Sequence, residues 1–239
     1  MTALKDLTAG FIKAHQTGSR ISPERHTLSR SDILAIQSTV MAELGAVAGF
    51  KVGRPLGSPI LAPIPAIYCA PNGGTRVVKD KLGVELEVGF ELICALPEGA
   101  FPEDVQNYFR PCVMLELVDT RIEGDLAEDA DYKFADFQIN AGLVKGDALT
   151  GWDGSDFGSL TAQLLADGTP VLEGEAIVPG GSALSNLALL VAHLGDHCGG
   201  LQVGQIVITG SICGLPYFAA GTDIIGNIDG LGQVSLSLT

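Results

Sequence analysis

Three glutamates in two apolar segments have the types and spacing that could do chemistry. Glu85 and Glu87 lie two positions apart in segment 84–92, where apolar and acidic residues alternate as they do along a strand. Residues i and i+2 of a strand share one face, so the two carboxylates can approach closely enough to ligate one cation. A solvated strand face would produce the same pattern, whereas a close pair of charges calls for a cation or a proton between them.

Glu116 interrupts the apolar run 112–118, which the sequence predicts to be a buried strand. A charged side chain there is costly to bury without a partner, and three kinds of partner are open. They are a basic residue such as Arg121 or a lysine, a shared proton, and a metal ion. Together with Glu85 and Glu87, Glu116 would complete an all-oxygen set of three carboxylates, which suits Mg²⁺ or Mn²⁺.

The composition narrows the class of protein. The 239 residues include 28 Asp and Glu against 14 Lys and Arg, a net charge of −14, which argues against a nucleic-acid partner. No run approaches the roughly 18 apolar residues of a membrane span, and segment 1–18 lacks the apolar stretch of a secretory signal. The five cysteines form no C-x-x-C pair, as is typical of free thiols. We therefore expect a cytoplasmic globular protein without nucleic-acid or membrane partners.

The elements that must position the glutamates are helices first, then a mostly β region with one late helix. Apolar residues at helical spacing and a Ser29–Asp32 capping box predict the first two helices. The expected helices span 4–14, 29 to about Gly45 or Gly49, and 182–198, and the expected strands span 84–92, 112–118, 139–144 and stretches beyond 203. Loop with short extended pieces is expected over 50–74, and a mobile surface loop or short helix over 123–137. We divide the chain into a helical region, 1–49, and a β-rich catalytic domain, 50–239, within one continuous globular unit.

Several short motifs resemble one known family in order and spacing. G-F-K-V-G at 49–53, V-E-L-E-V-G-F at 84–90 and L-E-L-V-D-T-R-I at 115–122 are similar to motifs of the 2-keto-4-pentenoate hydratase and 4-oxalocrotonate decarboxylase branch of the fumarylacetoacetate hydrolase superfamily. Further matches lie at 135–136, 142–146, 185–188, 206–211 and 230–235. The resemblance covers nearly the whole chain. It implies an α+β fold, a mixed β-roll of the fumarylacetoacetate hydrolase C-terminal type with N-terminal helices packed outside.

The resemblance also implies roles for five residues. The family's metal ligands fall on Glu85, Glu87 and Glu116, which would hold Mg²⁺ or Mn²⁺. Its lysine falls on Lys51, which would contact substrate or assist proton transfer, and its T-G-S serine falls on Ser211, which would meet the substrate carboxylate. Because Lys51 lies among apolar residues and glycines, we expect desolvation to lower its pKa.

The activity implied is that of a metal-dependent lyase in aromatic-compound catabolism. It would hydrate 2-hydroxypenta-2,4-dienoate (2-keto-4-pentenoate) type acids to 4-hydroxy-2-oxo acids, as a homo-oligomer, alone or complexed with a pathway enzyme. The loop 66–72 carries no acidic residue, and 137–139 lack the Asn and Ser of the family pattern. The alternatives are a 2-oxo-3-hexenedioate (4-oxalocrotonate) decarboxylase, an acylpyruvate-type C–C hydrolase, a tautomerase, and a catalytically silent family member that acts as a partner subunit.

Overall fold

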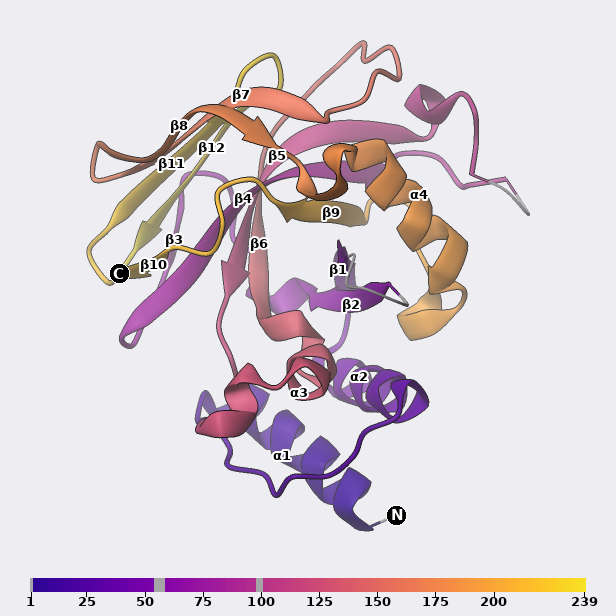
Figure 1. Cartoon of the computed structure of the whole chain (residues 1–239), viewed down its shortest axis with the longest axis vertical. Coiled ribbons are helices and arrows are strands. Elements are labelled where there is room, and N and C mark those ends of the chain that lie inside the picture. The colour runs from indigo at the N-terminus through magenta and orange to yellow at the C-terminus, as the bar shows by residue number, and fades with distance from the viewer. Residues whose placement is uncertain (1, 54–58, 98–100) are drawn as a thin grey trace.

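The computed structural model describes residues 2–53, 59–97 and 101–239, and the fold is α+β, as expected (Figure 1). The larger sheet contains, in spatial order, β2 (Ile60–Pro65), β1 (Val47–Gly53), β9 (Ile206–Ser211), β4 (Lys81–Leu92), β5 (Phe109–Val118) and β6 (Asn140–Ala148), with β10 (Tyr217–Ala219) paired to β4. The smaller sheet contains β3 (Gly74–Arg76), β12 (Gly232–Leu238), β11 (Asp223–Ile228), β7 (Ser159–Ala166) and β8 (Thr169–Ile177). Both sheets mix parallel and antiparallel pairs.

The helices lie outside the sheets. They are α1 (Thr2–Thr17), α2 (Arg30–Leu44), α3 (Ala130–Ala135) and α4 (Ala183–Leu194), with short 3₁₀ turns η1 (Ala66–Tyr68), η2 (Val105–Asn107), η3 (Asp125–Glu128), η4 (Phe137–Ile139), η5 (Pro179–Gly181) and η6 (His197–Gly199). Figure 1 shows α1, α2 and α3 grouped below the sheets and α4 beside β9. Over the described residues, none of these helices has both the length and the apolar character needed to cross a bilayer.

The sequence predictions for the helices are largely confirmed. The capping box is present, because the Ser29 hydroxyl accepts from the Asp32 backbone N–H while the Asp32 carboxylate accepts from that of Ser29. α4 ends at Leu194, four residues before the predicted end, and Gly195 follows with φ at +56°. Glycine reaches that left-handed region without steric cost, so the helix stops there. The division of the chain at residue 49 stays a prediction.

The two sheets pack face to face through alternate residues of their strands. Leu86 and Val88 of β4 and Leu115 of β5 are fully buried in an apolar cluster that spans both sheets. Successive side chains of a strand point to opposite faces, so Glu85 and Glu87 project from the other face of the larger sheet. The packing of the core therefore decides on which side of this sheet the acidic side chains lie.

Segment 50–74 is more regular than its glycines and prolines predict, apart from residues 54–58, which lie outside the described residues. Its first part belongs to β1 and β2, which join the larger sheet. β2 forms one end of the strand order, so one of its sides has no neighbouring strand. An edge strand tolerates proline, because the missing N–H can face the side where no hydrogen bond is needed. β1 comes very close to β9, since a Cβ at Gly49 would lie 1.9 Å from the Ile206 carbonyl oxygen. The short extended pieces that were predicted within this loop are thus two regular strands of the larger sheet.

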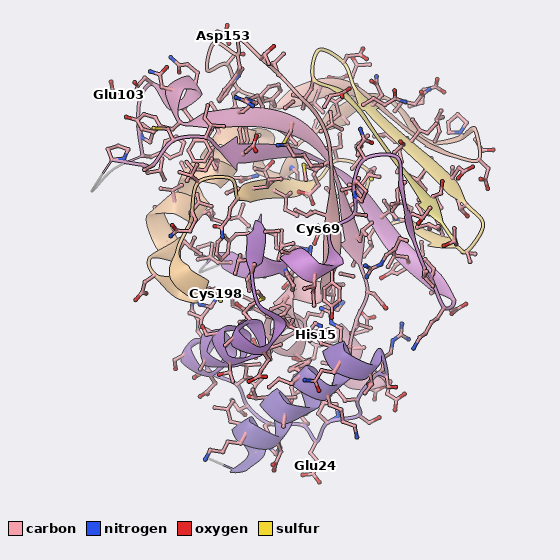
Figure 2. The ribbon with its side chains drawn as sticks, turned by 180° about the vertical axis from the view of Figure 1, so that it is seen from behind. His15, Glu24, Cys69, Glu103, Asp153 and Cys198 are labelled. Carbon is pink, nitrogen blue, oxygen red and sulfur yellow. The ribbon has the colours of Figure 1, made fainter. Side chains whose placement is uncertain are left out.

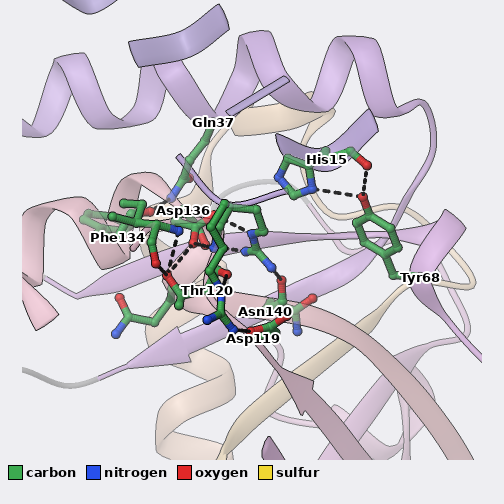
Figure 3. A network of polar contacts seen from close by, with 12 residues as sticks. His15, Gln37, Tyr68, Asp119, Thr120, Phe134, Asp136 and Asn140 are labelled. Atoms are coloured by element: carbon green, nitrogen blue, oxygen red, sulfur yellow. Dashed lines mark hydrogen bonds and ion pairs between the residues drawn. The ribbon is translucent and has the colours of Figure 1, made fainter. Parts of the chain in front are cut away.

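The acidic segment after β5, expected to be a mobile surface loop or short helix, is held by buried polar contacts (Figure 3). Arg121 donates from Nε to Asp136 Oδ1 at 2.6 Å and from Nη1 to the Asn140 carbonyl at 2.7 Å. Gln37 of α2 donates to the Phe134 carbonyl at 2.6 Å, which ties the segment to the N-terminal helices. These contacts determine where β6 begins.

Replacing Arg121 by methionine is expected to lower the free energy of unfolding by about 3–5 kcal/mol, because the buried Asp136 carboxylate loses its cation. Urea unfolding followed by circular dichroism measures this loss. Adding Asp136→Leu removes the orphaned charge and should recover part of the stability. A double variant no more stable than Arg121→Met alone would contradict the prediction.

Candidate metal centre

The three glutamates that the sequence singles out come together on one face of the larger sheet. Glu85 and Glu116 lie directly opposite each other on β4 and β5. One carboxylate oxygen from each of Glu85, Glu87 and Glu116 lies within 4.8 Å of the others. Glu87 and Glu116 are buried, and Glu85 is partly buried. The pairing of β4 with β5 thus assembles a set of three carboxylates from segments thirty residues apart.

Burial and mutual repulsion make this set unfavourable as three bare charges. Burial, and then the charge of Glu116, raises the pKa of Glu85 to about 7. The same two causes, in the same order, raise the pKa of Glu87 well above its ordinary value. Like charges that face each other across two strands destabilise the sheet unless a proton or a cation lies between them.

One oxygen of Glu116 lacks a hydrogen-bond donor among the described residues. Oε1 accepts from Lys51 Nζ at 2.6 Å and from Asn140 Nδ2 at 2.8 Å, whereas no described donor reaches the buried Oε2. An unpaired buried carboxylate oxygen is costly, and a divalent ion would satisfy it. Three carboxylates fit Mg²⁺ or Mn²⁺, which prefer oxygen ligands and keep positions for water or substrate.

Lys51 of β1 contributes the positive charge next to this set. Its Nζ donates to Glu116 Oε1 and, at 3.2 Å, to the Gln138 carbonyl. The predicted lowering of its pKa is wrong. Burial lowers the pKa of Lys51, but the charges of Glu116, Glu85 and Glu87 outweigh burial, and the net effect raises it. Without a bound metal, Lys51 therefore remains an ammonium ion.

Among the basic partners that the sequence left open for Glu116, the structure places Lys51 there. Arg121 pairs with Asp136 instead. The ion pair of Lys51 does not exclude a metal, since it uses only Oε1 of Glu116. A lysine bridge and a carboxylate set are thus both present at one site.

Ser211 lies at the end of β9, directly across from Glu87. A bulge between β4 and β9 accommodates Gly210, whose φ of +109° favours glycine. The Gly210 N–H donates to Glu87 Oε2 at 2.6 Å, and the Ser211 hydroxyl donates to the Gly214 carbonyl at 2.6 Å. The structure therefore brings both Lys51 and Ser211 to the border of the carboxylates.

Two further polar residues, which the motifs do not predict, also reach the site. Asn140 donates to Glu116, and its own Oδ1 accepts from the Gly142 N–H at 2.9 Å. Gln138 offers its carbonyl to Lys51, while its side-chain Oε1 is buried without a partner. The signal in the sequence was the departure from the family pattern at 137–139, which lies in the same turn.

That turn is strained. Phe137, Gln138 and Ile139 have φ values of +52°, +51° and +56°, all in the left-handed region that residues with a Cβ rarely adopt. Each such residue costs roughly 1–2 kcal/mol, so the surroundings must impose the conformation. Burial of Phe137 and the Arg121–Asp136 ion pair do so. The result is that the Gln138 carbonyl is aimed at Lys51.

Mg²⁺ binding is expected to tighten from about pH 6 to about pH 8, because ligating carboxylates must lose their protons. The pKa of Glu85 is raised to about 7, so Glu85 takes up a proton in this range without metal, and the raised pKa of Glu87 acts in the same direction. Isothermal titration calorimetry measures the dissociation constant at each pH. Buffers of different ionisation enthalpy report the protons released. An affinity independent of pH, with no proton release, would contradict the prediction.

The sequence and structure of the chain were compared with those of known proteins. No protein-family model matches the sequence. The chain is similar in structure to 4-oxalocrotonate decarboxylase from Pseudomonas putida G7, complexed with magnesium and adipate, over 100% of this chain and 97% of that one, at 20% identity and a TM-score of 0.78. It is also similar to fumarylpyruvate hydrolase from Pseudomonas aeruginosa, in complex with Mn²⁺ and pyruvate, over 80% of this chain and 88% of that one, at 19% identity and a TM-score of 0.59.

A third similar structure is 5-carboxymethyl-2-hydroxymuconate delta-isomerase from Mycobacterium smegmatis, over 81% of this chain and 78% of that one, at 12% identity and a TM-score of 0.57. At these low sequence identities, the matches show the fold alone. They confirm the α+β fold that was expected, and the superfamily that the motifs resemble stays a prediction. The chain has a mixed β-roll with helices packed outside.

Proposed function

We propose that this protein is a divalent-metal-dependent lyase that hydrates 2-hydroxypenta-2,4-dienoate type acids to 4-hydroxy-2-oxo acids. Glu85, Glu87 and Glu116 would hold Mg²⁺ or Mn²⁺. The observation that carries the proposal is the buried carboxylate set, with one unpartnered Glu116 oxygen, beside the ammonium group of Lys51. An ion bound there would supply Lewis acidity toward the oxygens of a 2-oxo acid. Two structures of the same fold, described above as complexes of a metal with a small acid, support this substrate class.

The proposed reaction adds one water molecule in two proton-balanced stages. First, the 2-hydroxyl loses its proton and C5 gains one, which gives a 2-oxo-3-enoate. Water then adds its hydroxyl to C4 and a proton to C3. Lys51 is the group placed to hold or transfer a proton, since its Nζ lies 2.6 Å from Glu116 Oε1.

Two other side chains would orient the substrate. The Ser211 hydroxyl lies across from Glu87 and would donate to the substrate carboxylate in place of the Gly214 carbonyl. The unpartnered Gln138 Oε1 would accept from a hydroxyl or from the attacking water. Loop 66–72 contains no acidic residue. Among the described residues, the polar side chains placed beside the carboxylates are those of Lys51, Ser211, Gln138 and Asn140.

The direct test is the conjugated-diene absorbance of 2-hydroxypenta-2,4-dienoate, followed with Mg²⁺ and then with excess chelator. The expected result is chelator-sensitive conversion to 4-hydroxy-2-oxopentanoate, identified by mass spectrometry. Ketonisation without water addition would retain the metal site and reject the hydratase. No conversion by protein with Mg²⁺ bound would reject the proposed substrate.

A decarboxylase is the second candidate, and one specific observation favours it. One match covers the whole chain, that to 4-oxalocrotonate decarboxylase complexed with magnesium and the dicarboxylate adipate. Such an enzyme would release CO₂ from 2-oxo-3-hexenedioate and leave 2-hydroxypenta-2,4-dienoate, the substrate of the hydratase. Parallel assays with the two acids distinguish the candidates, because only a decarboxylase releases CO₂.

Replacing Gln138 by leucine is expected to weaken binding of a small 2-oxo acid about tenfold, since the leucine keeps the bulk but removes the amide. Calorimetric titration of pyruvate into the Mg²⁺-loaded protein measures the affinity. Mg²⁺ affinity should not change. Gln163→Leu on β7, in the other sheet, is the matched control. Equal pyruvate affinity in both variants would remove Gln138 from the substrate site.

A further inference from the structure

A cavity of about 500 Å³ lies between the end of α1, the connection from β3 to β4, and the end of β5. Figure 2 shows His15 where α1 meets the β-rich part of the chain, and Figure 3 shows its contact with Tyr68; both residues line the cavity. None of the proposed metal-site residues lines it. Leu82, which does, points to the core face of β4, opposite to the face of Glu85 and Glu87.

The most informative lining residue is Arg76. Its side chain is half-buried, and its guanidinium donates only to two main-chain carbonyls, that of Ala141 at 3.2 Å and that of Tyr68 at 3.4 Å. It also lies over the Tyr68 ring, 5.5 Å from the centroid, and these are its side-chain contacts within the described part of the chain. Burial lowers the pKa of Arg76, as it does for a cation removed from water. Arginine has five N–H donors, so donors remain for an anion in the cavity.

Two lysines add to the charge of Arg76. Lys79 donates to the Gly18 carbonyl at 2.9 Å, and Lys81 lies 4.9 Å from the Tyr217 ring centroid. Over the described residues, none of the three cations has a carboxylate oxygen within 4.0 Å. The chain contains 28 acidic residues against 14 basic ones, so partners were available in excess. Three cations left unpaired around one cavity therefore point to a ligand.

The acidic residues around the cavity offset these cations only in part, although the charge of Asp119 acts to raise the pKa of Arg76. Asp119 is paired with Arg20 at 2.8 Å. Glu123 accepts from the Ser22 hydroxyl. Asp80 is exposed and makes no ion pair in the described part of the chain. The lining has five basic residues (Arg20, Arg76, Lys79, Lys81 and Arg121) and three acidic ones (Asp80, Asp119 and Glu123), so the cavity is net positive within a strongly acidic protein.

We propose that this cavity binds a small organic anion, a carboxylate or phosphate compound with a short apolar body, independently of the metal centre. The planar guanidinium of Arg76 matches carboxylate and phosphate oxygens, and the lysines add point charges. Ala14, Val78 and Leu82 supply apolar contacts for the rest of the ligand. The volume lies in the range of small-molecule sites, roughly 300–1,000 Å³.

The test titrates succinate and inorganic phosphate into chelator-treated protein at constant ionic strength, by isothermal titration calorimetry. At least one of the two anions should bind with a dissociation constant of about 1 mM or tighter. Arg76→Gln and Lys79→Gln should each weaken binding about tenfold. Lys79 is exposed, so its variant tests the site even if the Arg76 variant fails to fold. Arg110→Gln removes the same charge from β5 and is the matched control.

Glu116→Gln separates this site from the metal centre. We expect anion binding to be unchanged in that variant. In the unmodified protein, tighter binding of succinate than of phosphate assigns the ligand to the carboxylates, and the reverse assigns it to the phosphate compounds. The proposal is overturned if neither anion binds, if Lys79→Gln binds as tightly as Arg110→Gln, or if Glu116→Gln abolishes binding. Because no metal is present in this test, its result does not depend on the proposed lyase activity.

Discussion

Replacing Glu116 by glutamine is expected to abolish Mg²⁺ binding and to reduce hydration of 2-hydroxypenta-2,4-dienoate by more than about 100-fold. Loss of a residue that merely hydrogen-bonds to a metal ligand costs up to about 100-fold, and loss of a ligand itself should cost more. Glu116 supplies the carboxylate oxygen that is buried without a partner, and it faces Glu85 directly across the strand pair. Glutamine keeps the size of the side chain but removes its negative charge. The remaining two carboxylates hold a divalent ion more weakly, because ligand charge governs affinity.

Two measurements separate metal loss from misfolding. Bound Mg²⁺ raises the melting temperature by stabilising only the folded state, so saturating Mg²⁺ should shift the unmodified protein and not the Glu116→Gln variant. Glu91→Gln is the matched control on the same strand, where Glu91 is ion-paired with Lys145 at 2.8 Å. Metal affinity unchanged by Glu116→Gln and by Glu91→Gln alike would refute the three-carboxylate site.

Replacing Lys51 by methionine is expected to reduce turnover by about 10²–10⁴-fold while Mg²⁺ still binds, because general acid–base groups contribute effects of this size. Lys51 is ion-paired with Glu116 at 2.6 Å and also donates to the Gln138 carbonyl. Methionine preserves the apolar stem but cannot hold a proton or a positive charge. Loss of that charge also removes a repulsion against the metal, so Mg²⁺ affinity should be equal or higher.

The test compares steady-state kinetics with metal binding. For Lys51→Met, kcat should fall more than the affinity for pyruvate, which calorimetry measures on the Mg²⁺-loaded protein. Lys145→Met removes a lysine from β6 that is ion-paired with Glu91, and it should leave kcat within a few-fold. If both variants lose the same activity, Lys51 has no special role in proton transfer. If Lys51→Met no longer binds Mg²⁺, its role is to organise the glutamates.

Local sequence patterns predicted the parts of the site that depend on one segment. Alternation along β4 placed Glu85 and Glu87 on one face, and the apolar run of β5 marked Glu116 as a buried charge. The Ser29 capping box fixed the start of α2. These features follow from the geometry of a single strand or helix, which repeats every two or 3.6 residues and can be recognised without knowledge of the partners.

Other features depend on which segments meet, and no local pattern encodes them. β1 and β2 were expected to be mostly loop because proline and glycine disfavour strands in isolation, yet the sheet accepts them at an edge and at a close contact with β9. The pKa of Lys51 was predicted from its apolar neighbours in sequence, and these neighbours indicate only the lowering of the pKa by desolvation. The three carboxylates that raise it come from other strands.

The sequence by itself determined the chemistry that is available: three glutamates and a lysine, in motifs with a family's order and spacing, on a chain with enough apolar residues to bury them. Tertiary structure alone decided the partners. It set Lys51 rather than Arg121 beside Glu116, and it forced Gln138 into a left-handed turn next to them. The physical reason is that such pairings depend on strand register and core packing, which sum many weak contacts between residues far apart in the chain.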